Sequence, residues 1–117
     1  MATPDVDFGE GGAPVWRKKL SMEVLINGST IETDINVNGR LTEILFTVPD
    51  LDGSETSILT LLDEDDNEWF NSGSLAESTT HRLVVDRDIC GTTTVLITCA
   101  SAQDAARAHI VHLRGIR

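Results

Sequence analysis

Alternation of polar and apolar side chains is the sequence feature that most constrains this chain. Between Ser29 and Val37 one face would carry Ile31, Thr33, Ile35 and Val37, and the other Thr30, Glu32, Asp34 and Asn36. Side chains of a strand point to opposite faces in turn, so this pattern is typical of a half-buried β-strand with one face in water. The sequence therefore predicts that the Glu32–Asp34–Asn36 face of this strand is in water or meets a polar partner surface.

Similar short runs recur along the rest of the chain, separated by acidic or Asn/Gly-rich turns. Further strands are expected at 20–26, 40–48, 56–62, 68–71, 81–86, 92–99 and 109–113. The dipeptides Asn27-Gly28 and Asn38-Gly39 predict tight hairpins, and 101–107 is expected to be a hairpin loop rather than a helical turn. Seven or eight short strands with frequent turns predict an all-β fold, an antiparallel β-sandwich or jelly roll.

Within the expected strand 40–48, simple alternation places Thr42, Ile44, Phe46 and Val48 on one face and Leu41 and Leu45 on the other. Two cysteines, Cys90 and Cys99, flank the strand 92–99. A strand of this length separates its ends by about 30 Å, beyond the ~7 Å that a disulfide spans. The two cysteines are therefore not expected to pair with each other, although an intermolecular disulfide stays open.

The first residues differ in composition from the rest. Prolines and glycines within Met1–Val15 disfavour a helix or a central strand, so residues 1–19 are expected to form an extended arm and residues 20–117 the sandwich domain. The segment is either a frayed terminus or an arm that orders on a neighbouring subunit, with Phe8 and Trp16 in the partner's groove. The basic run Arg17-Lys18-Lys19 holds the acidic surface of a neighbour or is merely solvated.

Charge limits the classes of partner. The chain has 19 acidic and 9 basic residues and a formal net charge of −10. Such a surface repels phosphate backbones and anionic lipid, so neither nucleic acid nor a membrane is an expected partner. No apolar stretch approaches the ~20 residues of a membrane-spanning helix, and the acidic N-terminus does not resemble a signal peptide. The chain is therefore expected to stay in the cytosol where it is made.

Metal binding has weak support, and no cofactor is expected. Asp63, Asp65 and Asn67 have the one-three-five spacing of a calcium loop, but the glycine and glutamate that complete such a loop are missing at the two later positions. On a strand His109 and His112 would point to opposite faces, which disfavours a zinc site.

Enzymatic chemistry and sugar binding are two further classes of function. No serine lies in a nucleophile elbow. Acidic residues are abundant enough for a glycosidase-like carboxylate pair, but 117 residues of short strands rarely enclose a pocket as well as a core, so the chain is not expected to be an enzyme. A carbohydrate-binding adhesin module would require aromatic platforms. Only Trp69-Phe70 is available outside the arm and the expected core, and neighbours on a strand face opposite sides. Trp69 is thus the one candidate for a sugar contact.

The segment from Gly39 to Gly91 resembles a known class of protein. Its runs read GRLTEILFTVPDLDG, LTLLDEDD and NSGSLAESTTH, followed by CGTTTV. This pattern of strands and turns covers about half of the chain and resembles that of small β-rich virion structural proteins of tailed bacteriophages. The resemblance carries over no catalytic residue.

The resemblance implies a location and partners. It implies a capsid decoration (cement) protein that binds the major capsid protein or other virion proteins, with a tail or head–tail connector component as the alternative. It also implies a homo-oligomer, with a trimer favoured, and assembly into the virion in the host bacterial cytoplasm. The expected partner contacts are Phe8, Trp16 and the three basic residues 17–19.

Overall fold

The regular elements of the chain are all β-strands. The structure is a computed structural model that describes residues 15–53 and 55–117, and this part contains no helix. Its strands are β1 (Val15–Val24), β2 (Thr30–Asn36), β3 (Gly39–Val48), β4 (Thr56–Leu62), β5 (Glu68–Asn71), β6 (Leu75–Ala76), β7 (Thr79–Ile89), β8 (Thr92–Cys99) and β9 (Arg107–Ile116). The boundaries of β4, β5 and β8 agree with those expected from the sequence.

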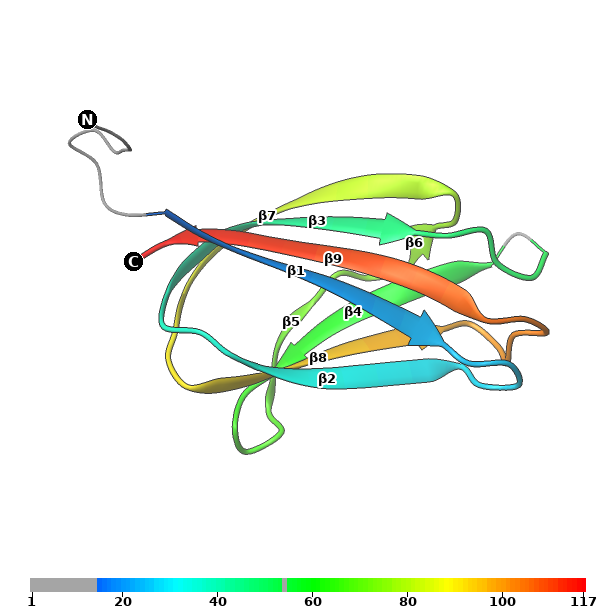
Figure 1. Ribbon diagram of the computed structural model, residues 1–117, viewed down its shortest axis with the longest axis horizontal. Helices are drawn as coiled ribbons and strands as arrows, with labels where there is room; N and C mark the ends of the chain where they lie inside the picture. The colour runs from blue at the N-terminus through cyan, green and yellow to red at the C-terminus, as the bar shows by residue number, and fades with distance from the viewer. Residues whose placement is uncertain (1–14, 54) are drawn as a thin grey trace.

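The strands form two antiparallel sheets that pack as a sandwich (Figure 1). Sheet A has the order β1-β9-β3-β7, and sheet B has the order β2-β8-β4-β5, with β6 also paired to β4. Successive strands mostly change sheet, and the first and last strands lie side by side. This order is that of a jelly roll. The predicted all-β fold, an antiparallel β-sandwich or jelly roll, is confirmed.

The two Asn-Gly dipeptides connect the sheets, so the predicted hairpins are wrong. Asn27 has a φ of 67°, and the amide of Gly28 donates to the carbonyl of Leu25 at 2.9 Å, as expected of a turn. However, β1 pairs with β9 and β2 pairs with β8. The Asn38-Gly39 turn likewise leads from sheet B to sheet A. The dipeptides indicate where the chain turns, but partners distant in sequence decide which strands pair.

The first strand begins five residues earlier than expected. Residues 15–19 belong to β1 and pair with the C-terminal half of β9, so they are part of the sandwich and not of an arm. Residues 1–14, which include Phe8, lie outside the described part of the chain. The expected arm is therefore limited to these fourteen residues.

Alternation in β2 is confirmed. Ile35 is buried and Ile31 packs against the core, while the side chains at Thr30, Glu32, Asp34 and Asn36 are exposed. The simple alternation expected for β3 fails at one point, because a β-bulge between Leu41 and Glu43 changes the register. The bulge adds a residue to one strand and brings Leu41 into the core together with Ile44.

Trp16 fills one end of the core. Its side chain is 5% exposed, and its Nε1–H donates to the carbonyl oxygen of Ile116 at 3.2 Å. Two glycines make room for the indole: a Cβ on Gly115 would lie 2.6 Å from ring carbons, and one on Gly39 would lie 2.8 Å from Nε1. Trp16 is thus an internal packing residue, which corrects its predicted role as an anchor in a partner's groove.

Loops at the opposite end of the sandwich are joined by Gln103, which is 1% exposed. Its backbone exchanges hydrogen bonds with the first interstrand turn, accepting from the amide of Asn27 at 2.7 Å and donating to the carbonyl of Gly28 at 3.0 Å. Its side-chain Oε1 accepts from the amide of Asp52 at 3.0 Å, and Nε2 donates to Glu55 at 2.9 Å. Gln103 thereby joins three loops, the first through its backbone and the others through its side chain.

A buried polar cluster lies in the core between the sheets. The Nδ1 of His109 faces the carbonyl of Arg107 at 3.2 Å and therefore carries the proton, since a carbonyl only accepts. Nε2 then accepts from the Ser57 hydroxyl at 2.9 Å, and Cys99 Sγ lies 3.6 Å from the same oxygen. Burial lowers the pKa of His109. Ser57 and His109 have no exposed surface, so this cluster is structural.

As expected, Cys90 and Cys99 do not form a disulfide with each other; Cys90 is exposed and Cys99 is buried. Residues 15–53 and 55–117 contain no helix that is long and apolar enough to cross a membrane.

Candidate docking face

Charge is divided unequally between the two sheets. The strands of sheet A contain eight of the nine basic residues of the chain and four acidic residues, a net charge of +4. The strands of sheet B contain no lysine or arginine and carry three acidic residues, Glu32, Asp34 and Glu68. An acidic protein therefore has one sheet that is positive and one that is negative.

Strand pairing gathers part of this positive charge on the outer face of sheet A. Arg17 on β1 is opposite Arg114 on β9, which in turn is opposite Glu43 on β3. One step along, Lys19 is opposite His112, and Leu45 is opposite both His112 and Arg82. We call the surface formed by Arg17, Lys19, Arg82 and Arg114 the basic face.

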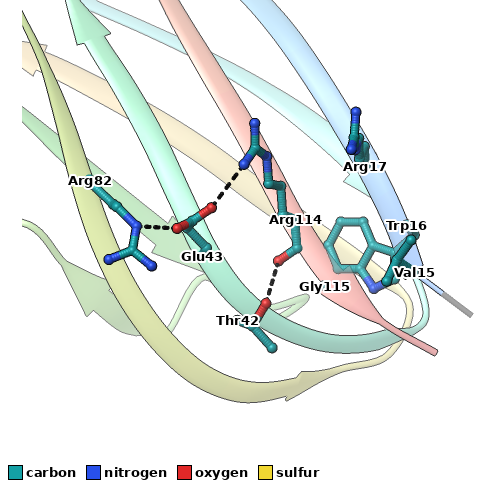
Figure 2. A pocket seen from close by; sticks show the side chains of 8 residues that line it. All are labelled: Val15, Trp16, Arg17, Thr42, Glu43, Arg82, Arg114 and Gly115. Carbon is teal, nitrogen blue, oxygen red and sulfur yellow. Dashed lines mark hydrogen bonds and ion pairs between the residues drawn. The ribbon is translucent and has the colours of Figure 1, made fainter. Parts of the chain in front are cut away.

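Glu43 lies within the basic face and pairs with two of its arginines (Figure 2). Arg82 Nε donates to one carboxylate oxygen, and Arg114 Nη1 donates to the other at 3.1 Å. Hydrogen bonding from Arg82, reinforced by the charge of Arg114, lowers the pKa of Glu43. No carboxylate in the described residues pairs with Arg17 or Lys19, so the face keeps a net positive charge.

An open hollow of about 310 Å³ lies beside this ion-pair group. Arg17, Arg82 and Arg114 line it together with Glu43 and Thr42, whose hydroxyl donates to the carbonyl of Arg114 at 3.2 Å. Figure 2 shows these side chains coming from β1, β3, β7 and β9. Val15 and Trp16 also line the hollow, and its guanidinium groups suit a carboxylate side chain of a protein partner.

The titration of His112 reports the positive potential of this face. Burial lowers its pKa, and the charges of Arg114, Arg17 and Lys19 lower it further. His112 is therefore held in its neutral form near neutral pH.

Apolar side chains also lie on the basic face. Val15 is 71% exposed and Val84 is 73% exposed, two of the four large apolar residues that are strongly exposed in the described chain. Val15 points to the same outer side of β1 as Arg17, because the two are separated by one residue. Val84 on β7 is opposite Glu43 on β3. Charged and exposed apolar groups that share one sheet surface are compatible with a protein-docking site.

The ion pairs of Glu43 lead to a pH-dependent stability. Because its pKa is lower in the folded chain than the unfolded value of about 4.3, its contribution is complete above that value and is lost as the pH falls through the folded pKa. We expect Glu43→Gln to destabilise the protein at pH 7, and the difference from wild type to shrink below about pH 4. Urea unfolding between pH 7 and 3 measures this; a difference independent of pH would contradict the ion-pair assignment, and Glu64→Gln controls for loss of one surface charge.

The predicted basic run divides between two faces. Arg17 and Lys19 point outward on the basic face, whereas Lys18 points to the other side of β1, opposite Leu113. All three side chains are exposed. The structure thus brings together two of the predicted contact residues and separates the third.

Trp69 does not present a free platform for sugar. The guanidinium of Arg87 lies 4.8 Å from the centre of its ring, a cation–π contact that covers one face. Both Trp69 and Phe70 pack against the core, so the expectation that they face opposite sides is wrong. A register shift between Leu61 and Leu62 on the neighbouring strand accompanies this arrangement.

The weak calcium candidates form a capped turn. Asp63 Oδ1 accepts from the amides of Asp65 and Asn67, at 2.9 Å each, and these hydrogen bonds lower the pKa of Asp63. The carboxylate thus stabilises its own loop between β4 and β5. Within the described residues, no three histidine, cysteine, aspartate or glutamate side chains are grouped as a metal site would require.

Three residues of the site were missed by sequence reasoning: Glu43, Arg82 and Arg114. Arg17 and Lys19, two residues apart on an expected strand, gave a local signal that one face would be basic. No local signal indicates that β9 lies between β1 and β3, because those two pairings join residues between 63 and 101 positions apart.

Comparisons with known proteins identify the fold and no family. The sequence matches no protein-family model and no curated protein. A solved structure from Bacillus endospore appendages, which form disulfide-linked pili, is 11% identical, with a TM-score of 0.53 and coverage of 97% of this chain and 98% of the other. The mitogen of Yersinia pseudotuberculosis is 8% identical, with a TM-score of 0.48 over 90% and 87% of the two chains.

Infectious bursal disease virus supplies a further similar structure. The likeness covers 91% of this chain and 32% of the viral chain, with 12% identity and a TM-score of 0.41. These identities are low, so the likenesses concern the fold alone.

Proposed function

We propose that this chain is a non-enzymatic structural protein of a virion, which works by docking onto neighbouring protein subunits. The observation that carries the proposal is the basic face on an otherwise acidic chain. Complementary charge directs protein subunits to one another and disfavours wrong partners. The basic face is formed by rigid sheet strands, which suits a surface that must keep its shape in an assembly.

The specific form proposed is a capsid decoration protein. The resemblance of 39–91 to small virion proteins of tailed bacteriophages supports it, and Bacillus endospore appendages, which form disulfide-linked pili, share the fold. Residues 1–14, including Phe8, would bind the major capsid protein, and the basic face would bind an adjoining subunit. The chain would be incorporated in the bacterial cytoplasm. A tail or connector component is the alternative within the same class.

Binding to purified capsids of the phage that encodes the chain tests the proposal. Truncation must remove only residues 1–14, because Trp16 belongs to the core. We expect this deletion to abolish co-sedimentation with capsids and leave unfolding unchanged. Arg17→Glu/Lys19→Glu should weaken incorporation at least tenfold, about 1.4 kcal/mol or more, because it reverses charge on the basic face.

Lys18→Glu is the matched control, since it makes the same kind of charge change on the other side of β1. It should leave incorporation within about twofold of wild type. Capsid binding that survives the truncation would contradict the role of residues 1–14. Equal losses for Lys18→Glu and the double variant would contradict docking through the basic face.

A further inference from the structure

The outer face of sheet B is complementary to the basic face in charge. Glu32 and Asp34 on β2 lie at one edge, and Glu68 on β5 lies toward the other. Glu32 is exposed and is opposite Leu96 on the central strand β8, and Glu68 is exposed and is opposite Leu62 on β4. We call this surface the acidic face.

The two faces also share a surface character. Between its acidic edges the acidic face carries threonines and partly buried apolar side chains, Ile58, Leu62 and Leu96. The basic face carries the exposed Val15 and Val84 among its charges. Each face thus combines charge with modest apolar area, as protein-docking surfaces do, and the charges are of opposite sign.

We propose that the occupant of the basic face is the acidic face of a second copy of this chain. The inference rests on the proposed docking role of the basic face and names its partner. The strands of one chain supply both members of the complementary pair: four basic side chains around Glu43 on the basic face, and the three carboxylates Glu32, Asp34 and Glu68 on the acidic face. No other acidic surface is needed to satisfy the basic face.

The arrangement of the faces determines the kind of assembly. The two sheets form opposite layers of the sandwich (Figure 1), so the docking faces point in opposite directions. A contact between different surfaces of identical subunits is heterologous, and it leads to an open row unless a rotation closes a ring. Copies stacked face to face therefore form an open row, in place of the trimer that the resemblance implied.

Sedimentation velocity of the purified full chain tests this contact. In low salt we expect oligomers that grow with concentration, and in about 1 M salt, where the Debye length is about 3 Å, we expect monomers. Arg17→Glu/Lys19→Glu and Glu32→Lys/Glu68→Lys should each weaken association at least tenfold. All four positions are exposed, so folding should be retained.

The decisive variant combines the four substitutions Arg17→Glu, Lys19→Glu, Glu32→Lys and Glu68→Lys. It restores opposite charges on the two faces and should recover association to within a few-fold of wild type. Lys18→Glu and Asp65→Lys control for charge changes elsewhere. If net charge alone controlled association, the variants would rank differently. Glu32→Lys/Glu68→Lys makes the net charge less negative, from −10 to −6, so this variant would then associate better than wild type.

The outcomes separate this inference from the proposed function. A wild-type chain that stays monomeric in low salt, or an exchanged variant as weak as the two double variants, would overturn the second copy as partner. A single trimer at every concentration would overturn the open row. A third outcome separates the two proposals. If only the Arg17→Glu/Lys19→Glu variant loses capsid binding, and the purified chain is monomeric at every salt and protein concentration, the docking role of the basic face is retained and self-association is overturned.

Discussion

Replacing Trp16 with alanine is expected to lower the free energy of unfolding by about 3–5 kcal/mol, the usual cost of removing a large buried aromatic side chain. The indole is 5% exposed and donates a hydrogen bond to the carbonyl of Ile116. Its ring occupies space that Gly115 and Gly39 leave open, so truncation leaves a cavity between backbone segments that cannot easily close. Urea unfolding followed by far-ultraviolet circular dichroism measures the change.

Val15→Ala is the matched control for this variant. Val15 is the neighbouring residue on β1 and is 71% exposed, so its truncation should change stability by about 0.5 kcal/mol or less. A Trp16→Ala chain as stable as wild type but unable to join an assembly would contradict the packing role. Such a result would return Trp16 to the role of a partner anchor.

Replacing Gln103 with alanine is expected to cost about 2–4 kcal/mol. A buried polar group left without its partner costs about 1–3 kcal/mol, and the side chain of Gln103 serves the amide of Asp52, the carboxylate of Glu55 and the carbonyl of Ser101. The variant should also increase amide exchange at Asp52, because that amide loses its acceptor. Urea unfolding and hydrogen exchange give the two readouts.

Glu64→Ala serves as the control for Gln103→Ala, since Glu64 is an exposed residue in the loop between β4 and β5. It should leave stability within about 0.5 kcal/mol of wild type. A Gln103→Ala chain that matches this control would show that the loops containing Asp52 and Gln103 are held together by other contacts, such as the 2.6 Å ion pair between Arg107 and Asp52.

Local pattern was a good guide to strands and a poor guide to their partners. The alternation of β2 and the β-branched run of β8 indicated where strands lie, because each depends on neighbours in sequence. The Asn27-Gly28 turn was identified correctly, yet it connects two sheets. The backbone of Gln103, which bonds both residues of that turn, is about 75 positions away, and no local rule includes it.

Departures from regular strand geometry account for further errors. Simple alternation placed Leu41 outside the core, and the bulge between Leu41 and Glu43 reverses that. The same kind of irregularity beside β5 accompanies the packing of both Trp69 and Phe70 against the core. The prolines and glycines just before Trp16 indicate a later start for the first strand, so the sequence alone places Trp16 in an arm.

The candidate site was foreseen only in part. Arg17 and Lys19 were predicted to contact a neighbour, and they lie on the basic face. Arg82 and Arg114 join them only because β7, β3, β9 and β1 lie in that order in sheet A. Charge separation between faces is a property of strand order, so composition alone, with a net charge of −10, gave no sign of a positive surface.

The central claim, that the basic face is covered by protein in the assembled state, is tested most directly by the two lysines of the chain. Lys18 and Lys19 are adjacent, both exposed, and on opposite sides of β1. Amine acylation followed by mass spectrometry measures the reactivity of each. The account predicts that assembly protects Lys19 at least tenfold while Lys18 reacts as in the free monomer; unchanged reactivity of Lys19 in the assembly would contradict it.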